Sequence, residues 1–130
     1  MPASLKVSHC LICDDVRLEV SYKETVVGIY ISGISVPSLP WFIFVCVWMS
    51  VIWSGDGEVS LEIRILDPLF NEIGQSRGHA RAIQTGRESA LTFRGLACNI
   101  ESEGNYTIQW RMEHGAWQTI KTVPVMLAKT

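Results

Sequence analysis

The sequence predicts an all-β fold, an antiparallel two-sheet β-sandwich of immunoglobulin-like or similar Greek-key type with about eight strands. Apolar residues alternate with period two in several windows, turn-forming residues separate these windows, and no long window sustains the apolar stripe of an amphipathic helix. With 130 residues, of which 48% are hydrophobic and 18% charged, the chain is large and apolar enough to bury a core. We therefore expect one sandwich domain over residues 1–130 and exclude a disordered chain.

Three windows predict strands with one face in a core and the other in water, because their apolar side chains occupy every second position. These apolar positions are Val16, Leu18, Val20 and Tyr22, then Val59, Leu61, Ile63 and Ile65, and finally Tyr106, Ile108, Trp110 and Met112. The polar residues between them, including Glu58 and Glu62, are expected on solvated faces. Less regular strands are expected at residues 5–13, 25–36, 41–53, 73–83, 91–100 and 117–127.

Turn chemistry separates these strands. Two prolines break the chain at Pro37 and Pro40, and glycines break it at Gly55, Gly57 and Gly86. A hairpin is expected at His114-Gly115, because glycine takes a positive φ freely and histidine tolerates one. The most polar stretch, residues 71–89, predicts a mobile excursion and a charged edge strand without a functional role. Its basic residues are Arg77, His79, Arg81 and Arg87.

Charge and hydropathy restrict the partners and the compartment. The 11 basic and 13 acidic residues nearly cancel, to a net charge of -2, so nucleic acid is not expected as a partner. No secretory signal is readable in residues 1–13, and we expect a cytoplasmic protein. The apolar run at residues 41–53 is shorter than the roughly twenty residues of a spanning helix, so no transmembrane segment is expected.

The four cysteines, Cys10, Cys13, Cys46 and Cys98, are expected to be buried free thiols. Cys10 and Cys13 form a Cys-x-x-Cys pair, which elsewhere binds zinc or cycles between thiols and a disulfide. One such pair is half a zinc site, and in a strand the two thiols would face opposite sides of the sheet. We therefore expect no metal and no other cofactor.

Two adjacent carboxylates, Asp14 and Asp15, leave open a calcium-binding or lipid-binding sandwich in which both are ligands. The alternative is a polar corner between strands. No Ser-His-Asp pattern, phosphate-binding loop or pair of acids points to catalysis, so an enzyme is not expected. An enzyme whose site is assembled from distant loops, using His9, His79 or His114, stays as a further alternative.

The run at residues 41–53 is apolar on both faces. Trp41 and Trp53 fall on one face and Trp48 on the other. A sandwich strand needs only one dry face, so the second must be covered by the chain itself, by a second copy or by another protein. Sugar-binding platforms also use tryptophan, but there the rings are exposed and interleaved with polar residues, which this run lacks.

The segment Cys13-Asp-Asp-Val-Arg-Leu-Glu19, followed by Gly28-Ile-Tyr30, resembles the opening of a family of small uncharacterised bacterial proteins. Their opening reads (Leu/Ile)-Cys-Asp-x-Val-Arg-x-Glu, and Gly104-Asn-Tyr-Thr-Ile is similar to their penultimate strand. The resemblance implies a cytoplasmic bacterial β-sandwich of unknown activity, and it implies no catalytic residue.

Together these observations predict a non-enzymatic protein-interaction or structural accessory module that self-associates or binds a partner protein. The docking element would be the apolar run or an edge strand. The residues expected to contact the partner are Trp41, Trp48, Trp53, Asp14, Asp15, Arg17 and Glu19.

Overall fold

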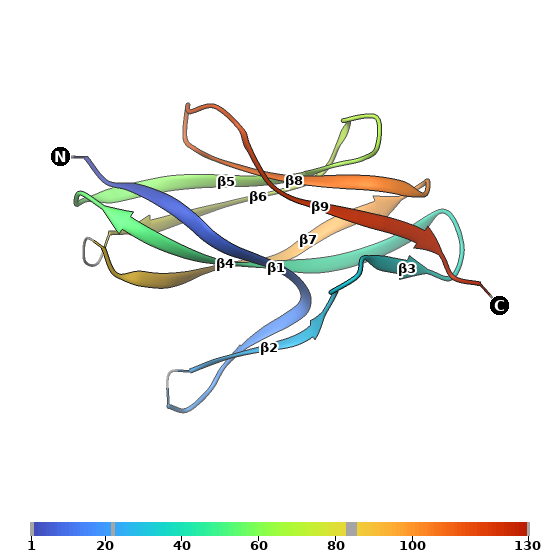
Figure 1. The fold of residues 1–130 in the computed structure, drawn as a ribbon, viewed down its shortest axis with the longest axis horizontal. Helices are drawn as coiled ribbons and strands as arrows, with labels where there is room; N and C mark the ends of the chain where they lie inside the picture. The colour runs from blue at the N-terminus through green and yellow to red at the C-terminus, as the bar shows by residue number, and fades with distance from the viewer. Residues whose placement is uncertain (1, 22, 83–85, 130) are drawn as a thin grey trace.

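The computed structural model describes residues 2–21, 23–82 and 86–129, which form nine strands without a helix (Figure 1). No helix in these ranges is thus long and apolar enough to cross a membrane. The strands are β1 (Ser4–Leu18), β2 (Glu24–Ile29), β3 (Ile34–Val36), β4 (Trp41–Ser54), β5 (Glu58–Leu66), β6 (Glu72–Arg81), β7 (Glu88–Ile100), β8 (Gly104–Met112) and β9 (Gln118–Leu127). The all-β prediction is confirmed, with nine strands in place of about eight.

The strands form two sheets that pack face to face. One sheet has the order β2-β1-β4-β7, and the other has the order β3-β9-β8-β5-β6. Both sheets curl into half-barrels, so the sandwich is rounder than expected (Figure 1). All pairs are antiparallel except the three-residue pair of β3 with β9, which is parallel. The chain enters β3 after crossing from the first sheet to the second.

In two of the three alternating windows the apolar residues are buried as predicted. In β5, Val59, Leu61, Ile63 and Ile65 are all buried, and in β8 the residues Tyr106, Ile108 and Trp110 are buried. The third window differs. β1 ends at Leu18, which is 65% exposed, and Val20 is fully exposed in the following turn; Tyr22 lies outside the described residues. The apolar alternation in the sequence continues beyond the end of β1. It does not mark a strand there, because no core contacts the side chains of this solvated turn.

Strand boundaries account for most other differences. Residues 5–13 and 16–18 join into one long strand, β1, while residues 25–36 divide into β2 and β3 in different sheets. Gly33, at a φ of 124°, lies between them in a conformation that is open to glycine and strained for other residues. The charged edge strand expected within residues 71–89 is confirmed, because β6 pairs with β5 from Glu72 to Arg81 at the edge of its sheet; residues 83–85 are not described.

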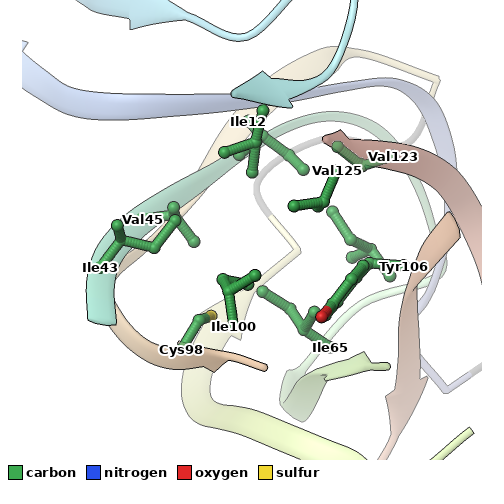
Figure 2. Close-up of a pocket in the computed structure, with 11 residues that line it drawn as sticks. Ile12, Ile43, Val45, Ile65, Cys98, Ile100, Tyr106, Val123 and Val125 are labelled. Atoms are coloured by element: carbon green, nitrogen blue, oxygen red, sulfur yellow. The ribbon is translucent and has the colours of Figure 1, made fainter. Parts of the chain in front are cut away.

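The apolar run at residues 41–53 is strand β4, as predicted, and it pairs with β1 and β7. Its inward side chains, Val45, Val47, Met49, Val51 and Trp53, are buried between the two sheets. Beside them lies a small cavity of about 20 Å³, lined by apolar side chains and the Tyr106 ring (Figure 2). A space of that size without polar partners is expected to be dry, so it is part of the packed core.

The chain itself covers part of the outer face of β4. Trp48 and Cys46 pack against Cys13 and Val16 of β1 and against Val26 of β2. The end of β1 and β2 therefore turn across this face, and Arg94 of β7 donates to the main-chain oxygen of Val16 from the other side. Further along β4, Phe42 and Phe44 are 56% and 62% exposed and meet edge to face. The chain therefore covers the outer face of β4 around Cys46 and Trp48, whereas the start of the strand is exposed on this face.

We expect Gly33→Ala to lower the free energy of unfolding by about 2 kcal/mol, from the positive φ together with a steric overlap. A Cβ at this position would lie 2.4 Å from the main-chain oxygen of Pro124 in β9. Gly57→Ala is the matched control, because Gly57 has a φ of 103° but open space around it. Urea unfolding of both variants measures the difference, and equal losses would show that the overlap with β9 costs nothing.

Candidate functional site

A continuous polar surface covers the outer side of the five-stranded sheet, and we call it the Glu62 face. Its side chains come from four adjacent strands and from the turn before β9, at positions that alternate with the buried core residues. The Glu62 face consists of Ser60, Glu62, Arg64, Gln75, Arg77, His79, Gln109, Arg111, Trp117 and Thr119.

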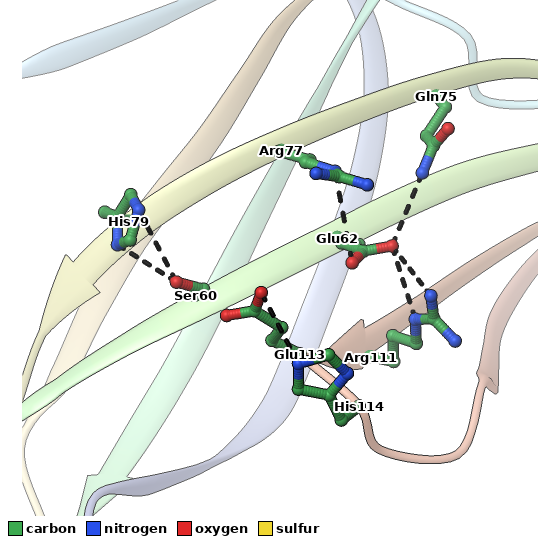
Figure 3. A network of polar contacts seen from close by, with 8 residues as sticks. All are labelled: Ser60, Glu62, Gln75, Arg77, His79, Arg111, Glu113 and His114. Carbon is green, nitrogen blue, oxygen red and sulfur yellow. Dashed lines mark hydrogen bonds and ion pairs between the residues drawn. The ribbon is translucent and has the colours of Figure 1, made fainter.

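Glu62 lies at the centre of this surface and is buried, with 5% of the residue exposed. The Nη2 and Nε atoms of Arg111 donate to its Oε2 atom at 3.0 and 3.3 Å, and Gln75 Nε2 donates to the same oxygen at 3.4 Å. Arg77 Nε lies 4.0 Å from Oε1 (Figure 3). A buried carboxylate requires such partners. The expectation that Glu62 sits on a solvated face is wrong, because side chains of β6 and β8 close over it.

Trp117, in the turn before β9, packs on two arginines of this surface. The guanidinium carbon of Arg64 lies 4.1 Å from the centre of its ring and that of Arg111 lies 4.3 Å away. Both distances are typical of cation-π contacts. Arg64 projects from β5 and Arg111 from β8, so these contacts hold the half-buried Trp117 ring against the five-stranded sheet.

The polar contacts continue to both edges of the Glu62 face. Toward β9, Arg64 Nε donates to Gln109 Oε1 at 2.9 Å, and Gln109 Nε2 donates to Thr119 Oγ1 at 3.1 Å. Toward β6, Ser60 Oγ lies 3.1 Å from His79 Nδ1 (Figure 3). These contacts fix amide, guanidinium and hydroxyl groups in one row across four strands.

A shallow cleft of about 150 Å³ opens at the β6 end of this row. Its lining includes Glu62, Arg77, His79 and also Glu113, which follows β8. The cleft brings together acceptors and donors of hydrogen bonds from β5, from β6 and from the segment after β8. Its volume is below the range of pockets that enclose a drug-sized ligand, so it suits one small polar group of a ligand that extends over the surface.

The structure does not gather the three tryptophans that the sequence singled out. Trp53 is buried in the core, Trp48 is half-buried beneath β1 and β2, and Trp41 is 39% exposed at the start of β4. Sequence reasoning overlooked Trp117, which lies among polar residues. The available signal was the row of alternating charges at residues 60–64, 75–79 and 109–113, which becomes a site only once the strand order is known.

The acidic corner of β1 is an internally paired structure. Asp14 Oδ1 accepts from the Tyr30 hydroxyl at 2.5 Å, and Asp15 Oδ1 accepts from Arg94 at 3.3 Å and from the Val16 amide at 2.8 Å. Arg17 Nε lies 3.7 Å from Asp15 Oδ2. On the same hairpin, Glu19 Oε1 accepts from Thr25. Within the described ranges no three His, Cys, Asp or Glu side chains are grouped to hold a metal ion.

The four cysteines are free thiols, three of them buried and Cys10 half-buried. Cys10 packs against the main core, whereas Cys13 belongs to the cluster on the outer face of β4, so the two face opposite sides as predicted. Burial raises the pKa of the Cys10 and Cys13 thiols to about 11. A thiol with such a pKa is protonated at neutral pH, which opposes attack on a disulfide.

A second polar cluster lies where β1, β4 and β7 meet, away from the Glu62 face. Glu88 Oε1 accepts from the hydroxyls of Ser50 and Ser8 and lies 4.0 Å from His9 Nδ1. These hydrogen bonds, with the Ser50 bond contributing most, hold the pKa of Glu88 below its ordinary value of 4.5.

We expect this cluster to add stability that is present above pH 4.5 and is lost as the pH falls through the lower pKa of the folded protein. The reason is that protonated Glu88 no longer accepts both serine hydroxyls. Glu88→Gln should flatten this part of the curve of unfolding free energy against pH, and Glu72→Gln, an exposed carboxylate on β6, serves as the control. A Glu88→Gln curve that parallels the wild type throughout would contradict the assignment.

No known family's sequence profile matches the chain, and no curated protein sequence matches it. Among solved structures, the chain is similar to a β-glucosidase from Listeria innocua in complex with glucose, with a TM-score of 0.50 and 11% identity. A second structure, of a β-glucosidase from Listeria innocua in complex with isofagomine, gives a TM-score of 0.47 and 12% identity. Each alignment covers 96% of this chain and 16% of the β-glucosidase.

This likeness concerns the fold, and it corrects the functional expectation. The sequence predicted a non-enzymatic protein-interaction or accessory module, but the similar fold occurs as part of a glycosidase. That expectation is therefore wrong as it was stated. The chain spans about one sixth of the length of that β-glucosidase, so the activity of the larger protein does not follow from the likeness.

Proposed function

We propose that this chain is a glycosidase-related β-sandwich domain that binds carbohydrate on the Glu62 face. The observation that carries the proposal is the position of Trp117, an aromatic ring supported by two arginines and surrounded by fixed polar side chains. An aromatic ring among polar groups is the arrangement that was missing from the apolar run of β4.

The chemistry of a sugar suits this surface. A pyranose ring has an apolar face of C–H groups that packs on an aromatic ring, and its rim of hydroxyls both donates and accepts hydrogen bonds. Next to Trp117, guanidinium groups offer donors, while Gln109 and Gln75 offer amides that can do both. These groups are held by one another in a rigid sheet, so little side-chain entropy is lost when a ligand binds.

The similar solved structure suggests the first ligands to test. Because that β-glucosidase was crystallised with glucose, glucose, methyl β-glucoside and a short β-linked glucan are the first probes. A short glucan would extend from Trp117 along the row of polar side chains toward the cleft at Glu62 and Arg77.

Isothermal titration calorimetry tests the proposal. We expect saturable binding of at least one probe, weakened by Trp117→Ala by about two- to tenfold, the range that corresponds to an aromatic contact. Trp41→Ala is the matched control, because Trp41 is also partly exposed but lies on the other sheet. An absence of heat with every probe, or equal weakening by both variants, would refute carbohydrate binding at this face.

A further inference from the structure

The charges of the Glu62 face are unbalanced around Trp117. Arg77 and Arg111 approach one carboxylate, Glu62, and a third arginine, Arg64, contacts the amide of Gln109 instead. Another acidic side chain, Glu113, also lines the cleft, and its Oε1 atom lies 3.7 Å from His114 Nε2. The part of the surface next to the ring therefore carries an excess of positive charge.

The three arginines differ in how far their charge is neutralised. Arg111 makes two hydrogen bonds to Glu62 and is the true partner of that carboxylate. Arg77 has a 75% exposed side chain and approaches Glu62 only to 4.0 Å. Arg64 donates to the neutral amide of Gln109, and among the described residues no carboxylate forms an ion pair with it. Arg64 and Arg77 therefore have guanidinium N–H groups that can donate hydrogen bonds to a ligand.

These two arginines lie on the same face of adjacent strands. The Arg64 guanidinium is held at Gln109 and Trp117, whereas that of Arg77 lies near Glu62. Arg64 is paired with Gln75 and Glu62 with Arg77 in the register of β5 and β6, so Arg64 and Arg77 are diagonal neighbours on the same face. Long side chains at diagonal positions on adjacent strands are within reach of one another, and the exposed Arg77 side chain is free to turn toward a ligand at Arg64. Planar guanidinium groups bind an oxyanion through two parallel hydrogen bonds.

We propose that the saccharide bound by the Glu62 face is acidic and carries a carboxylate or sulfate group that Arg64 binds beside Trp117, with the exposed Arg77 adding a second guanidinium at the diagonal position. This inference rests on the proposed function and specifies its ligand class. The oxyanion supplies the negative charge that the surface lacks, and the sugar ring supplies the apolar face that packs on Trp117.

Calorimetry with glucose, glucuronate and glucose 6-sulfate tests the ligand class, since the three share one ring and differ in charge. We expect one or both acidic sugars to bind about five times or more as tightly as glucose, within the range of a partly exposed ion pair. High salt should weaken the binding of the acidic sugars and leave that of glucose unchanged. The two acidic probes distinguish a carboxylate from a sulfate.

Matched variants then locate the charge. Arg77→Gln should remove part of the preference for the acidic sugar and keep the affinity for glucose. Arg64→Gln should weaken binding of the acidic sugar more than that of glucose but should weaken both, because Arg64 also supports the Trp117 ring. Arg17→Gln, which removes one positive charge on the other sheet, should change neither. Arg77 is largely exposed, so its variant keeps the fold even if that of Arg64 does not, and urea unfolding checks both.

The failures are distinguishable. Equal affinity for glucose and both acidic sugars would overturn this inference and leave carbohydrate binding standing. If acetate or inorganic sulfate bound as tightly as the acidic sugars, the surface would be a simple anion site and the inference would fall. No binding of any of the three sugars would overturn the inference, and the proposed function would fall with it only if methyl β-glucoside and the short glucan gave no heat either.

Discussion

Trp53→Ala is expected to lower the free energy of unfolding by about 4 kcal/mol, the typical cost of truncating a large aromatic side chain in a core. Trp53 is 1% exposed and lies between the two sheets at one end of β4. Its Nε1 atom also donates to Ser89 Oγ of β7 at 2.7 Å, so the variant leaves a cavity and removes a bond between neighbouring strands. Small domains are stable by about 5–15 kcal/mol, and this one substitution consumes much of that margin.

Urea unfolding of Trp53→Ala and Trp41→Ala measures this difference within one strand. Trp41 is 39% exposed, so its truncation should cost about 1 kcal/mol, in proportion to the smaller area that it buries. Trp53→Phe keeps most of the volume and loses the bond to Ser89, and it should fall between the two. Similar losses for Trp41 and Trp53 would show that the two ends of β4 are equally buried, contrary to the structure.

The sequence predicts the strands whose environment is uniform. β5 and β8 each have one face on the core along their whole length, so Val59 to Ile65 and Tyr106 to Trp110 alternate without interruption. The apolar run of β4 is also recognisable, since its inward residues are buried between the sheets and part of its outer face lies beneath β1 and β2. In these strands, local pattern and tertiary environment agree.

The prediction fails where a tertiary contact decides the outcome. The alternation at Leu18 and Val20 continued into an exposed turn, and the change of sheet at Gly33 depends on the contact of that glycine with Pro124. Neither of these facts is contained in the local pattern, because each depends on a partner that is distant in the sequence.

The candidate site could not be predicted from the sequence for the same reason. Glu62 alternates with core residues in the sequence as a solvated residue would. It is buried because β6 and β8 place Arg77 and Arg111 against it. Trp117 lies in a turn outside any alternating window. A list of motifs cannot find such a site, whereas the strand order β8-β5-β6 places its charges side by side.

Glu62→Ala is expected to lower the free energy of unfolding by about 3 kcal/mol, near the lower end for removing one partner of a buried ion pair. The variant leaves Arg111, whose side chain is only 29% exposed, without its carboxylate. Arg77→Gln should cost less than about 0.5 kcal/mol, because an exposed ion pair at the limit of contact contributes little. Urea unfolding distinguishes the two, and a loss for Glu62→Ala as small as that for Arg77→Gln would show that the central carboxylate is solvated.

A double variant separates the structural role of this ion pair from its proposed role in binding. Replacing both Glu62 and Arg111 with leucine removes the two charges together, and such replacements of buried pairs are often neutral for stability or even stabilising. Glu62→Leu/Arg111→Leu should therefore recover most of the stability that Glu62→Ala loses. It should nevertheless bind carbohydrate more weakly than the wild type, because the support beneath Trp117 and the polar centre of the surface are both gone. If the double variant were stable and bound sugars with wild-type affinity, the Glu62 ion pair would serve only the fold.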